Sequence, residues 1–376
     1  MLDPVHRALL DLAIRKVIGT ERALETFAQI ADGLPLSSVA RDRYTRWGPF
    51  PNHPVLARHT TLCPGATEAA LAFLFEFNLS HSVAFSKALL RAYQWTHPCA
   101  GRSFESRLIE LVARAVHELA VVLFQRRLRI HDSVWADRDP MYKIDAVKEL
   151  HPVTGKPYPT PFCHLEYGNV EQYPDGIADV VGYWAENRIL GGVVLLDRSD
   201  AWDDRLNPEP NVFLHSDYDS VTTRVWRALD EQQQALVDFL LSRPPAGAPR
   251  PRGNDSPLPL LASDKNLDRI DSDCATINKV YRDFWERWMP PQHGRFLQGS
   301  CRQSALDYPE QRRHSPDPLS YCRPERPSDD TPDTPDTTDT TDTNTSYEQV
   351  LAQLGGVGGG GVAVGARSPR CQALES

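Results

Sequence analysis

The chain has 376 residues, of which 41% are hydrophobic and 24% are charged, and this composition is typical of a soluble globular protein. Its formal net charge of −9 provides no basic surface for a phosphate backbone, so nucleic-acid binding is not expected. No apolar run reaches the roughly 20 residues that a bilayer requires, so neither a membrane span nor a signal peptide is predicted.

Seven cysteines are scattered along the chain, and no two of them form a C-x-x-C pair. The spacing therefore indicates neither a zinc knuckle nor a redox pair. Reduced thiols are typical of a cytoplasmic or nuclear protein, which is the location that we expect.

Residues 1–127 are predicted to form a helical, bundle-like part. Asp3 and Pro4 are a good helix start, because the carboxylate caps the first amides and proline has no amide hydrogen to leave unpaired. The longest expected helix covers residues 103–124 and carries a wide apolar stripe. His117 lies in this stripe without an acid or a second histidine on its face. We therefore expect a buried histidine with one hydrogen bond rather than a ligand.

Residues 128–243 are predicted to form a small mixed β-sheet with two helices. Strands are expected at residues 162–167, 193–196, 212–217 and 221–226. The helices are expected to begin near Asp175 and Asp230. The continuous apolar run at 193–196 is typical of a central strand. The predicted fold class is therefore α+β, with the helical part packed on this sheet.

The last third of the chain is expected to be mostly linker and tail. Residues 244–327 are rich in proline, and they contain one aromatic, amphipathic helix expected at about 272–289. Its exposed aromatics would make it a possible docking site for a protein partner through Tyr281, Trp285 and Trp288. Residues 328–376 combine an Asp-Thr-Pro tract with a glycine-rich run, a composition that predicts a disordered tail.

One group of polar residues suggests metal chemistry. His164 and Glu166 are two positions apart, His215 follows about fifty residues later, and Arg224 comes after it. Two imidazoles and one carboxylate can occupy one face of an octahedral iron(II) ion. An arginine beyond the second histidine can hold a co-substrate carboxylate through two hydrogen bonds.

In spacing, these residues resemble the H-x-D/E…H…R pattern of the 2-oxoglutarate-dependent oxygenases, a resemblance that covers five residues from His164 to Arg224. It implies Fe(II) bound by His164, Glu166 and His215, with Arg224 on the co-substrate. A second metal hypothesis places calcium or magnesium in acidic loops, at Asp197, Asp200, Asp203 and Asp204, or at Asp217 and Asp219.

Two classes of function therefore stay open. The favoured one is a soluble intracellular protein with no identifiable catalytic motif that serves packing or partner binding, since no nucleophile elbow or phosphate loop is found. The alternative is a non-haem metal-dependent oxygenase that uses His164, Glu166 and His215. Whether these three side chains converge distinguishes the two classes.

Overall fold

The computed structural model describes residues 2–44, 58–79, 81–97, 101–134, 144, 159–198, 210–218, 222–242 and 256–283. All of them belong to one compact unit, Met1–His314. The expected tail at 328–376 lies outside the described residues. Within the described ranges, no helix is both long and apolar enough to cross a bilayer.

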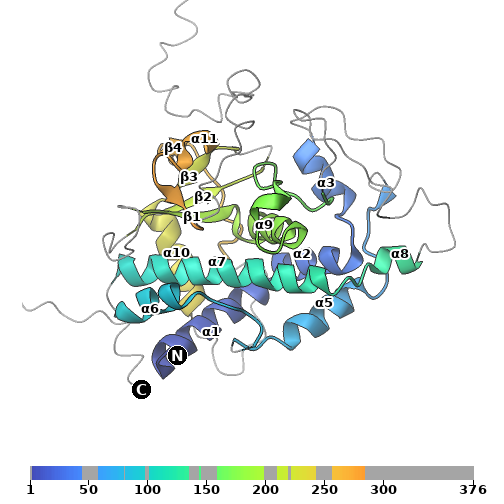
Figure 1. Cartoon of the computed structure of the whole chain (residues 1–376), viewed down its shortest axis with the longest axis horizontal. Helices are drawn as coiled ribbons and strands as arrows, with labels where there is room; N and C mark the ends of the chain where they lie inside the picture. The colour runs from blue at the N-terminus through green and yellow to red at the C-terminus, as the bar shows by residue number, and fades with distance from the viewer. Residues whose placement is uncertain are drawn as a thin grey trace, which may run out of the picture. The chain divides into compact units, whose positions relative to one another are not determined.

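The helical part begins as the sequence predicts. The Asp3 carboxylate accepts hydrogen bonds from the amides of Val5 and His6, and α1 starts at Pro4. The helices of this part are α1 (Pro4–Ile18), α2 (Glu21–Asp32), α3 (Ser37–Tyr44), α5 (Ala66–Phe75), α6 (Lys87–Trp95), α7 (Arg102–Gln125) and the short α8 (Ile130–Val134). The long α7 crosses this layer and packs against α1, α2 and α6 (Figure 1).

The helix α9 (Ile177–Leu190) joins the helical layer to the sheet. It packs most extensively against α7 and also contacts α2 and β1 (Val193–Asp197). Nearly all of its side chains are buried, and they include the charged residues Asp179, Glu186 and Arg188. One hydrophobic core therefore runs from α1 through α7 and α9 to the sheet and to α10 (Asp230–Leu241). The 3-10 helix η3 (Val170–Gln172) precedes α9.

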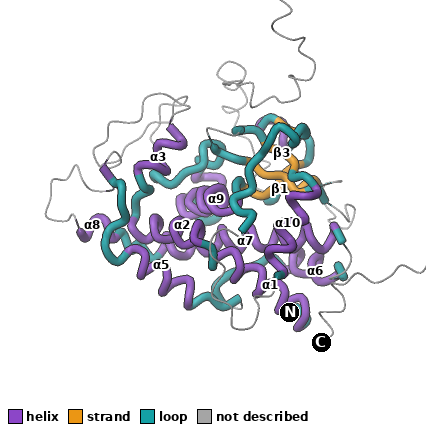
Figure 2. The backbone as a smooth tube through the Cα atoms, turned by 180° about the vertical axis from the view of Figure 1, so that it is seen from behind, coloured by secondary structure: helices purple, strands orange, loops and turns teal. Residues whose placement is uncertain are grey.

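The sheet has five strands in the order β4-β3-β2-β1-β5, and each neighbouring pair is antiparallel. The remaining strands are β2 (Val212–His215), β3 (Val225–Arg227), β4 (Arg269–Ile270) and β5 (Val280–Tyr281). The apolar run at 193–196 is an inner strand with buried side chains, as predicted. The α+β class is therefore confirmed, but the sheet is antiparallel throughout rather than mixed as predicted. The sheet lies near the start of α7, and α8 lies beyond the end of α7 (Figures 1 and 2).

Two predicted elements differ from the structure. Residues 162–167 form turns rather than a strand, although Phe162, His164 and Tyr167 are buried. The expected helix at 272–289 is wrong over its described part, which contains the four-residue α11 (Ser272–Ala275) and then β5. Ile277 is 79% exposed, whereas Tyr281 is 7% exposed and pairs with Leu196 of β1. Pairing with a sheet edge satisfies the backbone there and outweighs the helical spacing of the aromatics.

Residues 256–283 pack onto the fold, although the sequence suggested a linker there. The Leu260 amide donates to the Leu190 carbonyl at the end of α9. At Gly191, with φ of +101°, an added Cβ would lie 1.8 Å from the Leu260 oxygen. Only glycine fits this close approach. The segment then supplies both edge strands, β4 and β5.

Candidate metal centre

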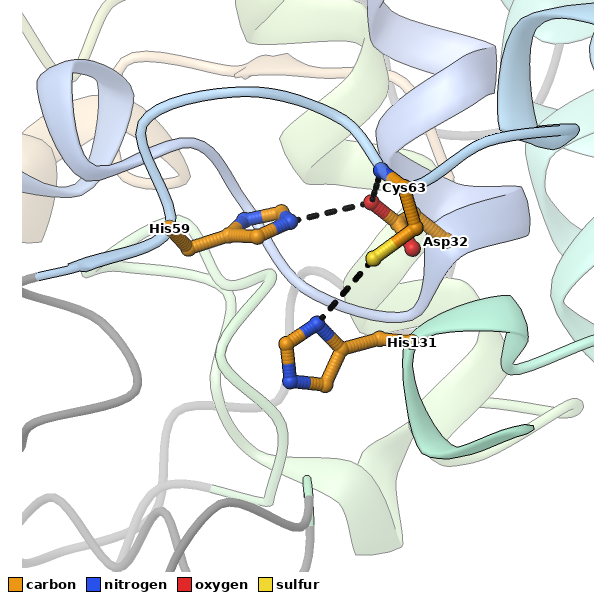
Figure 3. Close-up of side chains that lie close together, drawn as sticks. All are labelled: Asp32, His59, Cys63 and His131. Carbon is orange, nitrogen blue, oxygen red and sulfur yellow. Dashed lines mark hydrogen bonds and ion pairs between the residues drawn. The ribbon is translucent and has the colours of Figure 1, made fainter. Parts of the chain in front are cut away.

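Four side chains from three separate segments of the chain converge beside the end of α2. They are Asp32, His59, Cys63 and His131, and their potential ligand atoms all lie within 4.8 Å of one another (Figure 3). Their exposed fractions are only 0%, 5%, 8% and 3%. Within the described ranges, this is the group of three or more metal-ligating residues that the structure brings together.

The end of α2 places Asp32. It is the last helical residue, and Gly33 follows with φ of +96°. The Gly33 amide donates to the Gln29 carbonyl, which is the usual left-handed helix end. A Cβ at position 33 would lie 2.4 Å from Ile144 Cδ1 and 3.3 Å from Arg129 Cα. The chain can therefore leave the helix directly after Asp32 only because residue 33 is glycine.

The loop 58–65, which precedes α5, supplies His59 and Cys63. The His59 carbonyl accepts from the Ser37 amide (2.8 Å), and the Cys63 amide donates to Asp32 Oδ2 (2.9 Å). The His59 ring points at Asp32, and the Cys63 sulfur points at His131 (Figure 3). The loop thus brings a nitrogen and a sulfur donor to the end of α2.

The backbone before His131 is strained. Arg127 and Arg129 have φ of +52° and +44°, in the left-handed region that residues other than glycine rarely adopt. Each such residue costs on the order of 1 kcal/mol, and such strain is typical of functional sites. The turn ends at α8, whose second residue is His131. Its Nδ1 lies 3.5 Å from Cys63 Sγ.

The Asp32 carboxylate is charged although it is fully buried. Burial raises the pKa of Asp32, but the hydrogen bonds from His59 and from the Cys63 amide outweigh it, and the net pKa is lowered. Both of these bonds go to Oδ2, and Oδ1 has no hydrogen-bond partner. A buried carboxylate oxygen without a partner is costly unless a cation or a water satisfies it.

His59 has an acceptor at each ring nitrogen. Nδ1 lies 2.9 Å from the Pro35 carbonyl, and Nε2 lies 2.9 Å from Asp32 Oδ2. A carbonyl only accepts, so Nδ1 carries a hydrogen, and the lone pair of a neutral ring is then at Nε2. That lone pair would face a negative oxygen. The pair therefore requires a second proton on the ring or a metal cation at the same place.

The distances fit a tetrahedral zinc ion. Zinc binds sulfur at about 2.3 Å and histidine nitrogen at about 2.05 Å, so two such ligands lie about 3.6 Å apart. The 3.5 Å between Cys63 Sγ and His131 Nδ1 matches this value. The 2.9 Å between His59 Nε2 and Asp32 Oδ2 is shorter, and Oδ1 of the same carboxylate is the oxygen left for a metal.

Comparison of the chain with protein-family models, with curated proteins and with solved structures finds no match. The function must therefore be inferred from the geometry of the chain itself.

Of the residues in the oxygenase hypothesis, His164 and His215 lie side by side. The rings of His164 and His215 are buried with centroids 5.1 Å apart. His164 Nε2 lies 3.1 Å from the His215 carbonyl, and its Nδ1 accepts from the Glu166 amide. Both ring nitrogens are thus engaged by backbone groups. Burial lowers the pKa of His215 well below its usual value, and the nearby His164 lowers it further.

The Arg224 guanidinium bonds to β4 and to the residue after it. Its Nε donates to Asp271 Oδ1 (2.8 Å), and one Nη donates to the Arg269 carbonyl (2.9 Å), so it fastens β3 to β4. Of the acidic-loop residues, Asp197 accepts from Asn211, and Asp217 accepts from the Leu165 amide. Asp200, Asp203, Asp204 and Asp219 lie outside the described residues, as do Trp285 and Trp288.

Reasoning from the sequence missed all four residues of the cluster. Cys63 belongs to no paired-cysteine motif, because it is the only sulfur in the group. The spacing of His59 and Cys63 is the one local signal, and it is weak, since Asp32 and His131 come from distant segments.

A second set of buried charges fastens α7 to α9. His117 of α7 lies with Nδ1 2.9 Å from Glu186 Oε1 and with Nε2 2.9 Å from Asp179 Oδ1, and both acids come from α9. Arg282, just after β5, donates to both Glu186 oxygens (2.8 and 2.7 Å). The buried state predicted for His117 is confirmed, but it has two acidic partners rather than one hydrogen bond.

The same network continues along α7. Glu110 pairs with Arg198 (2.6 Å) and Arg107 (2.9 Å), and Arg114 pairs with Asp283. Burial raises the pKa of Glu110, but Arg198 and Arg107 outweigh it and lower this pKa to about 2. The charges therefore hold residues 280–283 onto the two helices.

Gly182 permits this crossing of α7 and α9. A Cβ there would lie 2.7 Å from Cε1 and from Nε2 of the His117 ring. Because this distance is shorter than any normal contact, the two helices approach closely only where residue 182 has no side chain.

We expect the fold to lose stability in alkaline solution through His117. Burial by itself lowers the pKa of His117, but hydrogen bonds to Asp179 and Glu186 outweigh it and raise this pKa to about 9. Protonated His117 stabilises the folded state because its pKa is higher there than in the unfolded chain. This stabilisation is complete below the unfolded-state pKa near 6.5 and is lost as the pH rises through the folded-state pKa of about 9. The loss between pH 7 and 10 should be on the order of 2–3 kcal/mol. Urea unfolding across this range measures it, and a His117→Gln variant with the same slope would contradict it.

Proposed function

We propose that this chain is a zinc-binding protein whose metal centre consists of Asp32, His59, Cys63 and His131. The observation that supports this most is the convergence of four buried donor atoms within 4.8 Å. Three separate segments supply them, and nothing in local sequence requires these segments to meet.

The donor set favours zinc over other metals. One sulfur, two imidazole nitrogens and one carboxylate oxygen are ligands that zinc accepts in a four-coordinate site. Calcium and magnesium require mostly oxygen donors in larger number. Copper binds similar donors, so the metal has to be measured by competition.

Four protein ligands favour a structural rather than a catalytic role. Catalytic zinc sites usually offer three protein ligands and keep one position for water, whereas structural sites are closed. The hydrogen bond from His59 Nδ1 to the Pro35 carbonyl supports the same role, because such a bond fixes the ring orientation of a zinc ligand. In this proposal, the ion joins the end of α2, loop 58–65 and α8.

Metal analysis of the purified chain tests the proposal. We expect one zinc per chain, and a loss of affinity of at least about 100-fold in His131→Gln and in Asp32→Asn. The matched control is His6→Gln, because His6 is also a buried histidine, bonded to Asp3 and to the Thr96 carbonyl, but lies outside the cluster. Zinc at less than one tenth of the chain concentration, after purification with zinc present, would contradict the proposal.

The oxygenase hypothesis stays a prediction, and the same samples test it. Iron or manganese that binds the chain and is lost in His215→Ala would support it. The partner-binding hypothesis also stays a prediction, although Tyr281 is buried within the sheet.

A further inference from the structure

The metal-ligating residues are themselves the main anchors of loop 58–65. Within residues 58–65, His59 and Cys63 are the buried residues, Leu62 is half-buried, and the others are exposed. These two residues also bond to the rest of the fold, at Pro35, Ser37, Asp32 and His131, and Leu62 packs against the core. Loss of the ligand cluster would therefore release the loop from the fold.

Cys63 provides the only sulfur among the four donors. A metal-bound thiolate is the one ligand of this set that a hydroperoxide oxidises. None of the cysteines in the described ranges, Cys63, Cys163 and Cys274, forms a disulfide. Oxidation at Cys63 therefore has a sulfenic acid as its first product.

On the basis of the proposed zinc site, we propose that the Asp32–His59–Cys63–His131 centre is a peroxide-sensitive switch, in which oxidation of Cys63 expels zinc and releases loop 58–65. The thiolate sulfur attacks one oxygen of hydrogen peroxide, an S–O bond forms, and the O–O bond breaks. The sulfur loses two electrons, and the departing hydroxide takes a proton from solvent to give water. Two molecules of a small thiol reverse the step, through a mixed disulfide and one more water.

The closed geometry explains why a change at one ligand opens the site. A sulfenic acid is a weaker and bulkier ligand than a thiolate, and Sγ has His131 Nδ1 only 3.5 Å away. Only three ligands then remain, from Asp32, His59 and His131, whereas a structural zinc site has four. Without the ion, the peptide bond between Arg58 and His59 lies in a released loop, where a protease can reach it. The Arg58 side chain is exposed even before release.

The test uses the full-length, zinc-loaded chain and hydrogen peroxide. A chromogenic chelator reports zinc release, and brief trypsin digestion reports release of the loop through cleavage after Arg58, identified by mass spectrometry. We expect one zinc released per chain and cleavage faster by about tenfold or more. Trapping with a sulfenic-acid reagent should label Cys63 in step with zinc release. Treatment with a small thiol followed by zinc should restore protection.

Two variants control the chemistry. Cys63→His keeps a zinc ligand but has no sulfur, so it should hold zinc in peroxide. Cys163→Ser should respond as the wild type does, because Cys163 lies outside the cluster. If Cys63→His binds no zinc, the sulfenic-acid label on the wild type takes its place as the test. Zinc release without labelling of Cys63 would overturn the switch.

The outcomes separate the two proposals. A wild-type chain that binds no zinc contradicts the proposed function. A wild-type chain that binds one zinc and retains it while Cys63 is oxidised contradicts only the switch. Removal of zinc by a chelator alone, which should also expose Arg58–His59, shows whether the loop depends on the ion.

Discussion

Removal of zinc is expected to lower the free energy of unfolding by about 4 kcal/mol, relative to the chain at a free zinc concentration 1,000 times the dissociation constant. The ion binds only the folded chain, because its four ligands come from three segments that meet only on folding. Without the ion, the cluster keeps a buried carboxylate with one unpartnered oxygen. Urea unfolding with zinc and with a chelator measures the difference.

The variant His131→Gln separates this effect from a general action of the chelator. It should unfold at the same urea concentration with zinc and with chelator, since it has lost a ligand. Equal stability of the wild type in both solutions, with zinc shown to be bound, would contradict the structural role of the ion.

Replacement of Glu186 by glutamine is expected to destabilise the fold by about 3–5 kcal/mol. Burial raises the pKa of Glu186, but Arg282 and His117 outweigh it and the net pKa is lowered, so the folded protein holds a carboxylate there. The amide has the same size but removes the anion that Arg282 and His117 share, and each buried cation then keeps one carboxylate, Asp283 and Asp179 respectively. Breaking one partner of a buried ion pair is costly for this reason.

Glu76→Gln is the matched control for this change. Glu76 pairs with Arg126 at 3.2 Å, but its side chain is 63% exposed, so the same substitution should cost at most about 1 kcal/mol. Similar losses at the two positions, measured by urea unfolding at pH 7, would show that the buried network does not act as described.

Local patterns in the sequence predict the elements whose causes are local. The cap at Asp3, the buried run at Val193 and the burial of His117 follow from neighbouring residues alone. The turns at 162–167 and the strand β5 depend instead on partners distant in sequence, such as β1 for Tyr281. The metal cluster is the extreme case, because its residues span about a hundred positions and share no common spacing.

The close approach of Gly182 to the His117 ring couples these two positions, so we expect a change at one to require a change at the other. A side chain at 182 would push α7 away from α9 and draw His117 from Glu186, so packing and charge would fail in one step. A natural variant with alanine at 182 should therefore carry a residue smaller than histidine at 117, and a different partner for the carboxylate at 186.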